Sequence, residues 1–490
     1  MEFLDETTEE GVETRSRRVS EPAPYLFVVL ECARPRAGGM RVSLEGVDEV
    51  VIGRGAERRV TRTSDGSTKR VRVEVPDART SGRHARLTRT SDGFRLEDLG
   101  STNGTVVARR RITSVLLDDE GMFETGETLF LLRTSVVTRG PARDLDAGEL
   151  AALPPGLRTL IPSLADELAS VARVAPSEVP VLLLGESGTG KEVLARAIHV
   201  QSKRTGEFVA VNCAALPSSL LESQLFGYKK GAFSGAVKDE LGLVRASEGG
   251  TLFLDEIGDM SPSSQTALLR VLQEKEVLPV GGTKPVRVDL RVVAATHQKL
   301  DGASEFRRDL YARLAGFIHR LRPFRERRED AGLILASVLS AAGAPEGIRT
   351  SVRFGRALLR YAFPLNMREL TQIVGVSSVL ATDGTLDLPE GASPLRAALE
   401  EVDAEELPDR GASAGVGAGR VGHMARVGAT TLPITPPAPL DETAALVRDA
   451  LVRHRGNVSE IARELGKTRM QIHRWMKRYG LDPEMFRGQR

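Results

Sequence analysis

The sequence predicts a multidomain protein that combines three fold classes: an all-β sandwich, an α/β domain and an all-α helix-turn-helix. Short β-rich runs, separated by Gly, Asp and Ser, fill residues 25–138 and are typical of a sandwich. Buried strands alternate with helical segments from residue 157 onward, which favours a doubly wound α/β core. A helical pattern with turn residues over positions 440–481 indicates the last domain.

The composition is typical of a soluble globular protein of about three domains, with 490 residues, 27% of them charged and 41% hydrophobic. The net charge of +2 neither supports nor excludes nucleic-acid binding, so local charge must decide. Two cysteines, Cys32 and Cys213, are too few for a disulfide framework, which favours a reducing compartment. No apolar run approaches membrane-spanning length, and the N-terminus is acidic where a signal peptide is basic. We therefore expect a cytoplasmic protein.

Composition shifts divide the chain into five parts. Residues 1–22 are acidic and rich in Thr and Ser, which predicts a flexible tail. Residues 23–138 hold the sandwich, and a Gly/Pro/Ala stretch, 140–156, leads into the α/β domain at 157–389. Residues 390–439 are rich in Gly, Ala and Pro and read as a linker, and residues 440–482 form the C-terminal domain.

The α/β domain is organised around the stretch VLLLGESGTGKE, residues 181–192. Four apolar residues predict a buried strand, which breaks into a glycine-rich turn before a helical pattern begins. Such a turn directs backbone N–H groups at an anion, and the lysine and the helix N-terminus add positive charge. A glycine-rich connection without function is the alternative. We assign the phosphates of ATP to the loop residues Gly185, Glu186, Ser187, Gly188, Thr189, Gly190, Lys191 and Glu192.

A second buried strand, GGTLFLDEIGDM, ends in two acidic residues. Asp255 is suited to hold Mg²⁺ through water, and Glu256 to orient or deprotonate the attacking water. Solvated acids at a strand end are the alternative, but the position about 65 residues after a phosphate loop favours the catalytic interpretation. A third buried strand, residues 290–297, carries a polar tip.

The sandwich region resembles the forkhead-associated (FHA) domain in the segments IGR (52–54), SGRH (81–84) and DLGSTNGT (98–105). In that family, loops at one end of the sandwich bind phosphothreonine on a partner, here a phosphorylated protein or a Ser/Thr kinase. The resemblance implies that Arg54 pairs with the phosphate, Ser81 and Thr102 donate hydroxyl hydrogen bonds, Asn103 holds the peptide backbone and His84 braces the loops. A basic insertion, residues 58–70, is expected to reshape the loop end. A sandwich used only for packing remains the alternative.

The α/β domain resembles the AAA+ domain of sigma-54-dependent transcriptional activators, the bacterial enhancer-binding proteins. The motifs occur in family order: GESGTGKE, GAFSGA, GGTLFLDEIGD, FRRDLYARL, RPFRERRED and PLNMREL. The resemblance implies ATP and Mg²⁺ as ligands, a ring that is expected to be a hexamer, and glutamate at position 192. It also implies that an exposed loop contacts the sigma factor of RNA polymerase, with Ser234 in place of the usual Thr. This loop consists of Gly231, Ala232, Phe233, Ser234, Gly235 and Ala236.

Further site residues follow from this resemblance by position. Asn212 matches the residue that holds the catalytic glutamate in an inactive pose, and Thr296 and His297 match the sensor of the γ-phosphate. Arg307 and Arg313 match arginines that reach into the neighbouring subunit's site, with Arg308 as an extra basic neighbour. Arg368 matches a second sensor on a small helical subdomain.

The C-terminal segment has Ala462, Gly466 and Ile472 at helix-turn-helix spacing. Ten Lys or Arg against four Asp or Glu over residues 451–490 make it basic, while the rest is near neutral. The segment resembles the Fis-type DNA-binding domain that closes most of these activators. We expect its second helix to contact double-stranded DNA through Thr468, Arg469, Gln471, His473, Arg474 and Lys477.

The residues and resemblances together predict an ATP-hydrolysing activator that binds upstream DNA and remodels RNA polymerase carrying sigma-54, with phosphothreonine recognition as its input. Two alternatives stay open. One is a phosphopeptide-responsive repressor or scaffold with an idle ATPase module, and the other is an ATPase that remodels a different target.

Overall fold

The computed structural model describes residues 22–300, 305–381 and 383–388, and separate residues and short runs between 449 and 476. The chain divides into two units after residue 409. No helix within the described ranges has both the length and the apolar character that crossing a bilayer requires. Cys32 and Cys213 are buried free thiols, as the sequence predicted.

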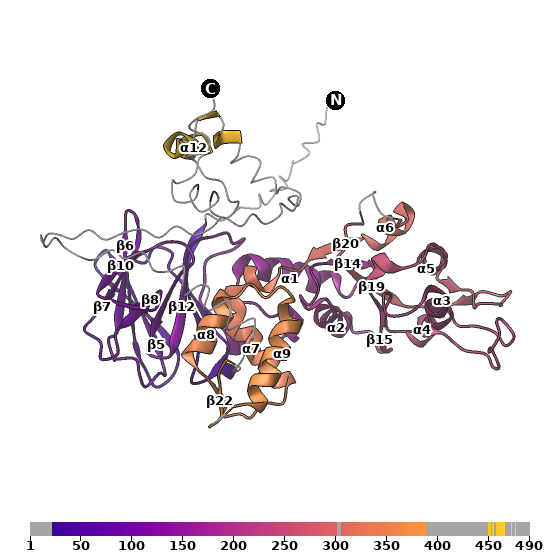
Figure 1. Ribbon diagram of the computed structural model, residues 1–490, viewed down its shortest axis with the longest axis horizontal. Helices are drawn as coiled ribbons and strands as arrows, with labels where there is room; N and C mark the ends of the chain where they lie inside the picture. The colour runs from indigo at the N-terminus through magenta and orange to yellow at the C-terminus, as the bar shows by residue number, and fades with distance from the viewer. Residues whose placement is uncertain are drawn as a thin grey trace, which may run out of the picture. The chain divides into compact units, whose positions relative to one another are not determined.

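The first unit begins with a sandwich of two β-sheets (Figure 1). The seven-stranded sheet has, in spatial order, β13 (Leu145–Asp146), β2 (Met40–Ser43), β1 (Ala23–Glu31), β12 (Thr128–Val136), β11 (Gly121–Thr125), β8 (Thr105–Val107) and β9 (Arg110–Ile112). The six-stranded sheet has β10 (Ser114–Leu117), β7 (Gly93–Asp98), β6 (Ala85–Thr90), β3 (Glu49–Arg54), β5 (Thr68–Val75) and β4 (Arg59–Asp65). The all-β prediction for this region is confirmed.

Strand β1 is buried along its whole length, so both faces of its sheet are covered. Leu26 and Val28 point into the core between the two sheets. Tyr25, Phe27 and Val29 alternate with them and join a second core with the helical subdomain described below. The sandwich therefore shares one hydrophobic core with the helical subdomain.

The α/β domain is built on five parallel strands in the order β15-β16-β19-β14-β20. Alternate residues of the apolar strands feed two separate cores, one on each face of the sheet, which is the doubly wound arrangement that the sequence predicted. The strands are β14 (Val181–Leu184), β15 (Phe208–Asn212), β16 (Thr251–Asp255), β19 (Arg291–Thr296) and β20 (Phe317–Arg320). The helices are α1 (Pro162–Val174), α2 (Lys191–Ser202), α3 (Ser218–Phe226), α4 (Leu243–Ala246), α5 (Pro262–Glu274) and α6 (Arg308–Leu314).

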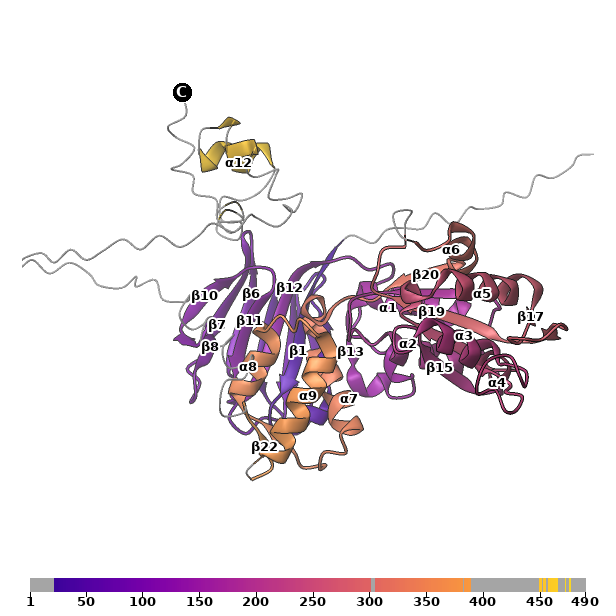
Figure 2. The same ribbon diagram turned by 45° about the vertical axis from the view of Figure 1, so that its right-hand side comes forward.

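A small helical subdomain, which we call the lid, follows β20. It contains α7 (Ala331–Ala341), α8 (Val352–Arg360) and α9 (Asn366–Val379), with the short pair β21 (Arg349–Thr350) and β22 (Thr385–Leu386). Its apolar side chains pack against the outer face of the seven-stranded sheet, and Figure 2 shows the lid helices beside the sandwich. Ion pairs flank this contact, including Arg356 with Glu124 at 2.6 Å and Arg349 with Glu127 at 3.0 Å.

Two segments that were expected to be a connection and a loop insertion, residues 140–156 and 58–70, form regular secondary structure. Residues 140–156, read as a leading segment, add β13 to the sandwich and then form the short 3₁₀ helices η2 (Ala147–Leu150) and η3 (Pro155–Leu157). The insertion 58–70 forms the edge strand β4, which pairs with β5 through a hairpin turn and is exposed along nearly its whole length, as its polar residues allow at a sheet edge. Arg58 at its start is buried instead of lying at the loop end, since it pairs with Glu31 and Asp146.

In the second unit, α12 (Val458–Glu464) is described. Its Ile461 and Ala462 pack with Ala450, Leu451, Ile472 and Met476 in a small core. Burial of Ala462 and Ile472 together agrees with the predicted spacing of two crossing helices.

Candidate nucleotide site and partner loops

The glycine-rich loop connects β14 to α2 at the carboxyl edge of the parallel sheet, where such sheets bind ligands. Gly188 and Gly190 have φ angles of +75° and +93°, which side chains other than glycine rarely adopt. Lys191 is buried, and its Nζ donates to the carbonyl of Gly185 at 3.0 Å. Glu192 lies on the outer side of α2, where it pairs with Arg196 at 2.7 Å. The loop thus presents backbone N–H groups and one ammonium group to an anion.

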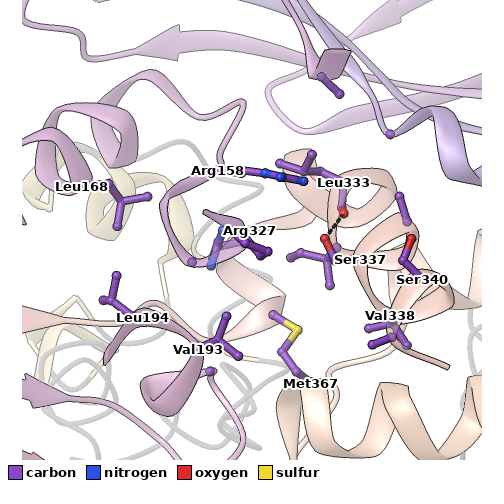
Figure 3. A pocket seen from close by; sticks show the side chains of 18 of the residues that line it. Arg158, Leu168, Val193, Leu194, Arg327, Leu333, Ser337, Val338, Ser340 and Met367 are labelled. Atoms are coloured by element: carbon purple, nitrogen blue, oxygen red, sulfur yellow. Dashed lines mark hydrogen bonds between the residues drawn. The ribbon is translucent and has the colours of Figure 1, made fainter. Parts of the chain in front are cut away.

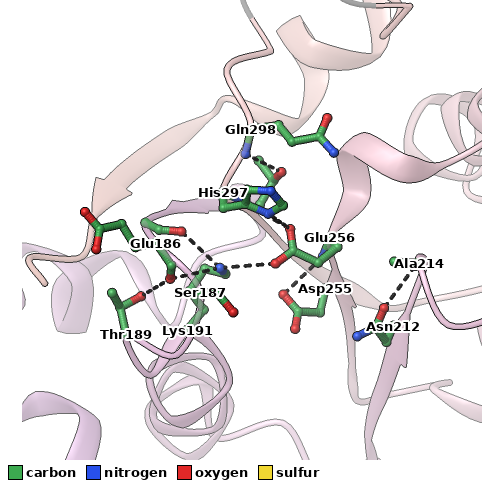
Figure 4. A network of polar contacts seen from close by, with 12 residues as sticks. Glu186, Ser187, Thr189, Lys191, Asn212, Ala214, Asp255, Glu256, His297 and Gln298 are labelled. Atoms are coloured by element: carbon green, nitrogen blue, oxygen red, sulfur yellow. Dashed lines mark hydrogen bonds and ion pairs between the residues drawn. The ribbon is translucent and has the colours of Figure 1, made fainter. Parts of the chain in front are cut away.

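Glu256 lies directly after β16 and faces this loop (Figure 4). Its Oε1 is 3.4 Å from the Nζ of Lys191, and its Oε2 is 2.7 Å from the Nδ1 of His297. The backbone of Glu256 is left-handed, with φ of +50°, a conformation that is uncommon outside glycine and concentrates at functional sites. The geometry brings Lys191, Glu256 and His297 together, as the resemblance implied.

The two acids of this site are shifted in opposite directions. Burial raises the pKa of Asp255, although Lys191 acts against the rise. Burial also acts to raise the pKa of Glu256, but the hydrogen bonds from His297 and the charge of Lys191 outweigh it and lower this pKa. Two neighbouring carboxyl groups with separated pKa values suit two different roles.

Two further predicted residues of this site, Asn212 and Thr296, accept hydrogen bonds from backbone N–H groups. Asn212 ends the neighbouring strand opposite Asp255, and its Oδ1 accepts a hydrogen bond from the N–H of Ala214 at 2.9 Å. Glu256 is held by Lys191 and His297 in this structure, as Figure 4 shows. Thr296 is buried at the end of β19, with its hydroxyl bound to the N–H of Gln298.

Arg307 precedes helix α6 as its N-cap residue, and Arg313 lies in the last turn of that helix. The guanidinium of Arg307 pairs with Asp309 at 2.6 Å and donates to the hydroxyl of Thr266 at 3.1 Å. Both arginines are exposed. This exposure leaves them available to a neighbouring copy of the chain.

The lid reaches the glycine-rich loop through α9. Arg368 donates to the hydroxyl of Ser187 at 3.0 Å, and the N–H of Met367 donates to the carbonyl of Gly188 at 2.9 Å. Sequence reasoning missed a further contact, in which Arg325 and Asn366 both bind the carboxylate of Glu186. The hydrogen bonds from Arg325 lower the pKa of Glu186 to about 2. The loop and the lid are therefore joined by polar contacts on the phosphate side.

A cavity of about 730 Å³ opens beside Thr189 and Gly190, a volume typical of small-molecule sites (Figure 3). The sequence analysis did not predict it. Its walls are largely apolar and come from α1, α2, α7 and α9, through Leu164, Leu168, Leu194, Leu333 and Met367. A nucleotide whose phosphates lie in the loop would extend its base and ribose into this space. We call the cavity the nucleoside pocket.

The predicted sigma-contact loop, residues 231–236, is compact and exposed at its tip. The N–H of Gly231 donates to the carbonyl of Ala236 at 2.9 Å, and both Gly231 and Gly235 have positive φ angles. Phe233 lies between these ends and is 45% exposed, with its ring edge against Tyr228. The loop therefore closes on itself and presents one aromatic side chain.

The predicted phosphothreonine residues gather at one end of the sandwich. The N–H of Thr102 donates to the hydroxyl of Ser81 at 3.2 Å, and Asn103 donates to the carbonyl of Arg79 at 2.6 Å. His84 is fully buried and joins both loops, because its ring contacts the N–H of Ser81 and the carbonyl of Gly104. Arg54 is exposed beside them, and its N–H donates to the carbonyl of Ser81.

The six predicted DNA-contacting residues, 468, 469, 471, 473, 474 and 477, lie outside the residues that the structure describes. Their assignment stays a prediction.

Family models match three parts of the chain. A sigma-54 interaction domain matches residues 159–319, an FHA domain matches residues 50–126, and the Fis family of bacterial regulatory proteins matches residues 444–479. These matches confirm the three resemblances that the motifs predicted.

Known relatives are similar to this chain over about two thirds of its length. The hydrogenase transcriptional regulatory protein HoxA of Cupriavidus necator is 42% identical over 324 residues, which are 64% of this chain and 62% of HoxA. The Nif-specific regulatory protein of Rhodobacter capsulatus is 40% identical over 341 residues, which are 68% of this chain and 55% of that protein. A crystal structure of NtrX from Brucella abortus in complex with ADP is 27% identical, with a TM-score of 0.43, and the match covers 65% of this chain and 68% of NtrX. The chain spans about three fifths of HoxA's length.

Proposed function

We propose that this chain, which matches the sigma-54 interaction, FHA and Fis-family models, is a sigma-54-dependent transcriptional activator that hydrolyses ATP to remodel RNA polymerase carrying sigma-54. The proposal includes binding of upstream DNA through the C-terminal helices and assembly into a ring of identical subunits, expected to be a hexamer. Phosphothreonine recognition by the FHA domain supplies the input.

The chemistry at the phosphate site follows from its side chains. Lys191 and the backbone N–H groups of the loop bind the β- and γ-phosphates. Glu256 keeps its carboxylate ionised because its pKa is lowered, and it orients or deprotonates the attacking water. Arg368 reaches the loop from the lid and reports the presence of the γ-phosphate.

Asp255 fits a magnesium ion that arrives with the nucleotide. Within the described part of the chain, no cluster of three or more His, Cys, Asp or Glu could hold a metal without help. Mg²⁺ usually needs only one or two carboxylates, together with phosphate oxygens and waters, so a single aspartate beside the loop suffices. The ion would neutralise charge that develops on the phosphates.

The exposed arginines of α6 complete the site across a subunit boundary. Arg307 and Arg313 stabilise the charge of the transferring phosphoryl group in the adjacent subunit, so that hydrolysis depends on ring assembly. The ion pair of Arg307 with Asp309 must open for this contact to form.

The observation that carries the proposal is the loop with Phe233 at its tip. Nucleotide chemistry needs no exposed aromatic ring on a self-closed loop, whereas an aromatic anchor between small residues suits insertion into a protein partner. The ring is 45% exposed in the free chain, so partner binding has apolar surface left to bury.

The test compares two substitutions of equally exposed side chains. Phe233→Ala should retain ATP hydrolysis but fail to convert a closed sigma-54 promoter complex into an open one. Leu220→Ala is the matched control, because Leu220 is also 45% exposed but lies on α3, outside the loop. Promoter opening is measured by permanganate reactivity of the melted strand. If Phe233→Ala opened the promoter normally, the protein would more readily be an ATPase that remodels a different target, or a scaffold with an idle ATPase module.

A further inference from the structure

Two segments of the sandwich domain line the nucleoside pocket. They are residues 36–38, after β1, and residues 147, 148 and 151, after β13, and we call them the sandwich wall. The two segments touch, since the N–H of Ala147 donates to the carbonyl of Gly39 at 2.9 Å. The pocket therefore has three walls, from the α/β domain, the lid and the sandwich.

The sandwich wall lies in direct contact with α7 of the lid. A Cβ built on Gly332 would approach the carbonyl oxygen of Val29 to 2.1 Å and that of Gly38 to 2.9 Å, so only glycine permits this approach. Arg36 adds polar contacts, because it donates to the hydroxyl of Ser340 at 3.2 Å and to the carbonyl of Ala344. The position of the wall is thereby tied to the lid helix that also supplies Leu333 to the pocket.

One buried arginine holds both segments of the wall. The guanidinium of Arg58 donates to the carbonyl of Ala37 at 3.0 Å and to both carboxylate oxygens of Asp146, at 2.6 and 2.9 Å. Asp146 caps η2, the helix that contains Ala147 and Gly148. A third pair, with Glu31 at 2.9 Å, fixes the guanidinium from the side of β1. The side chain of Arg58 is only 7% exposed, so these bonds form largely away from water.

Arg58 also lies close in sequence to the predicted phosphate contact. Strand β3 ends at Arg54 and β4 begins at Arg59, so Arg54 and Arg58 belong to the same short connection. Only three residues of backbone therefore separate the predicted phosphate contact from the arginine that holds the wall.

We propose that the sandwich wall is a nucleotide-binding surface for the base and ribose of ATP, and that Arg58 is the positioning residue that holds it. This inference rests on the proposed ATPase function, since it assigns the pocket to the nucleoside of the same ATP. The affinity for nucleotide then depends on the phosphothreonine-binding domain. Phosphopeptide binding and nucleotide binding change each other's affinity by the same factor.

The first experiment places bulk on the wall without disturbing the core. Ala151→Trp extends an exposed side chain at the pocket, and Ala152→Trp makes the same change one position further, outside the pocket lining. In the full chain, Ala151→Trp should weaken equilibrium binding of ATP and ADP about tenfold, and Ala152→Trp should leave it within about twofold. Equal affinities for the two variants would overturn the assignment of the wall to the nucleoside.

The second experiment tests positioning by Arg58. Arg58→Gln should raise the KM for ATP about fivefold while kcat at saturating ATP stays unchanged, because the phosphate site is intact. Arg62→Gln is the matched control, since Arg62 is 43% exposed and binds Asp144 and Ser43 instead of the wall. Arg58→Lys keeps the charge but loses the two-pronged contact with Asp146, so its KM should fall between those of wild type and Arg58→Gln.

The outcomes separate the two proposals. A wild-type chain that neither binds nor hydrolyses ATP contradicts the proposed function. A wild-type chain that does both, together with unchanged nucleotide affinity in Ala151→Trp and an unchanged KM in Arg58→Gln, contradicts only the sandwich wall.

Discussion

The phosphate half and the nucleoside half of the candidate site are built in different ways. The phosphate half uses polar groups at the carboxyl ends of parallel strands β14 and β16, which flank β19, and Lys191, Asp255 and Glu256 all come from the α/β domain. The nucleoside half uses apolar side chains from three walls, and its segments lie far apart in sequence, as the contact between Arg36 and Ser340 across 304 positions illustrates. On the proposed assignment, the groups that act on the phosphates come mainly from one domain, whereas the pocket for the nucleoside is lined by three.

Glu256→Gln should impair only the phosphate half of the site, and its effect on kcat should be the largest of the effects predicted. Loss of the carboxylate removes the group that orients or deprotonates water, so kcat should fall by about 100-fold or more. ATP affinity should stay within a few-fold, because the loop and the pocket are unchanged and Lys191, although it loses its ionic partner, keeps its hydrogen bond to the carbonyl of Gly185. Steady-state hydrolysis and equilibrium binding of ATP measure the two effects.

The control for this substitution is Glu207→Gln, an exposed glutamate on the same domain. It should leave both quantities unchanged. A Glu256→Gln variant with near-normal turnover would mean that another residue activates the water, and the catalytic role of Glu256 would be lost.

Ser337→Phe should weaken binding in the nucleoside half and leave the phosphate half unchanged. Ser337 lies on α7 and lines the pocket, where it donates to the carbonyl of Leu333, so a phenyl ring there occupies space meant for base and ribose. Affinity for ATP and ADP should fall about tenfold. Inorganic tripolyphosphate lacks a nucleoside, so the affinity with which it competes for the site should stay within about twofold of its wild-type value.

Val379→Phe on α9 is the control for this change, because Val379 is 86% exposed and does not line the pocket. If Ser337→Phe weakened ATP and tripolyphosphate equally, the two halves would not be separable, and the comparison between them would fail.

The sequence predicted the phosphate half well because its signals are local. The glycines that need positive φ, the lysine and the helix start all fall within residues 185–191, and the acids directly follow an apolar strand. The pairing of His297 with Glu256 was not predicted, because it depends on the adjacency of β16 and β19 in the sheet. The binding partners of Glu186 were missed, because Arg325 lies 139 positions away and no motif joins the two residues.

The nucleoside half was not predicted, although one signal was present. Strand β1 reads YLFVVL without the polar alternation expected of a sandwich strand with one wet face, and the structure buries all nine of its residues. That run indicated a second packing partner for the sheet. It could not identify the lid as that partner, because complementary packing depends on side-chain shape across 300 residues of chain.

His297→Ala gives the smallest expected effect and tests how the phosphate half keeps Glu256 ionised. In the wild type, His297 and Lys191 lower the pKa of Glu256 against the effect of burial, so activity that needs the carboxylate is lost only as the pH falls through this lowered value. Without the imidazole, the single hydrogen bond from its ring is lost, while the one from the backbone N–H of the same residue stays, and the effect of burial on this pKa is less well opposed. The pKa should rise, and the acidic limb of the kcat profile should move to higher pH while activity at pH 8 changes little. Lys299→Ala, an exposed neighbour, should leave the profile in place. An acidic limb that stayed fixed in His297→Ala would contradict a role of the imidazole in setting the pKa of Glu256.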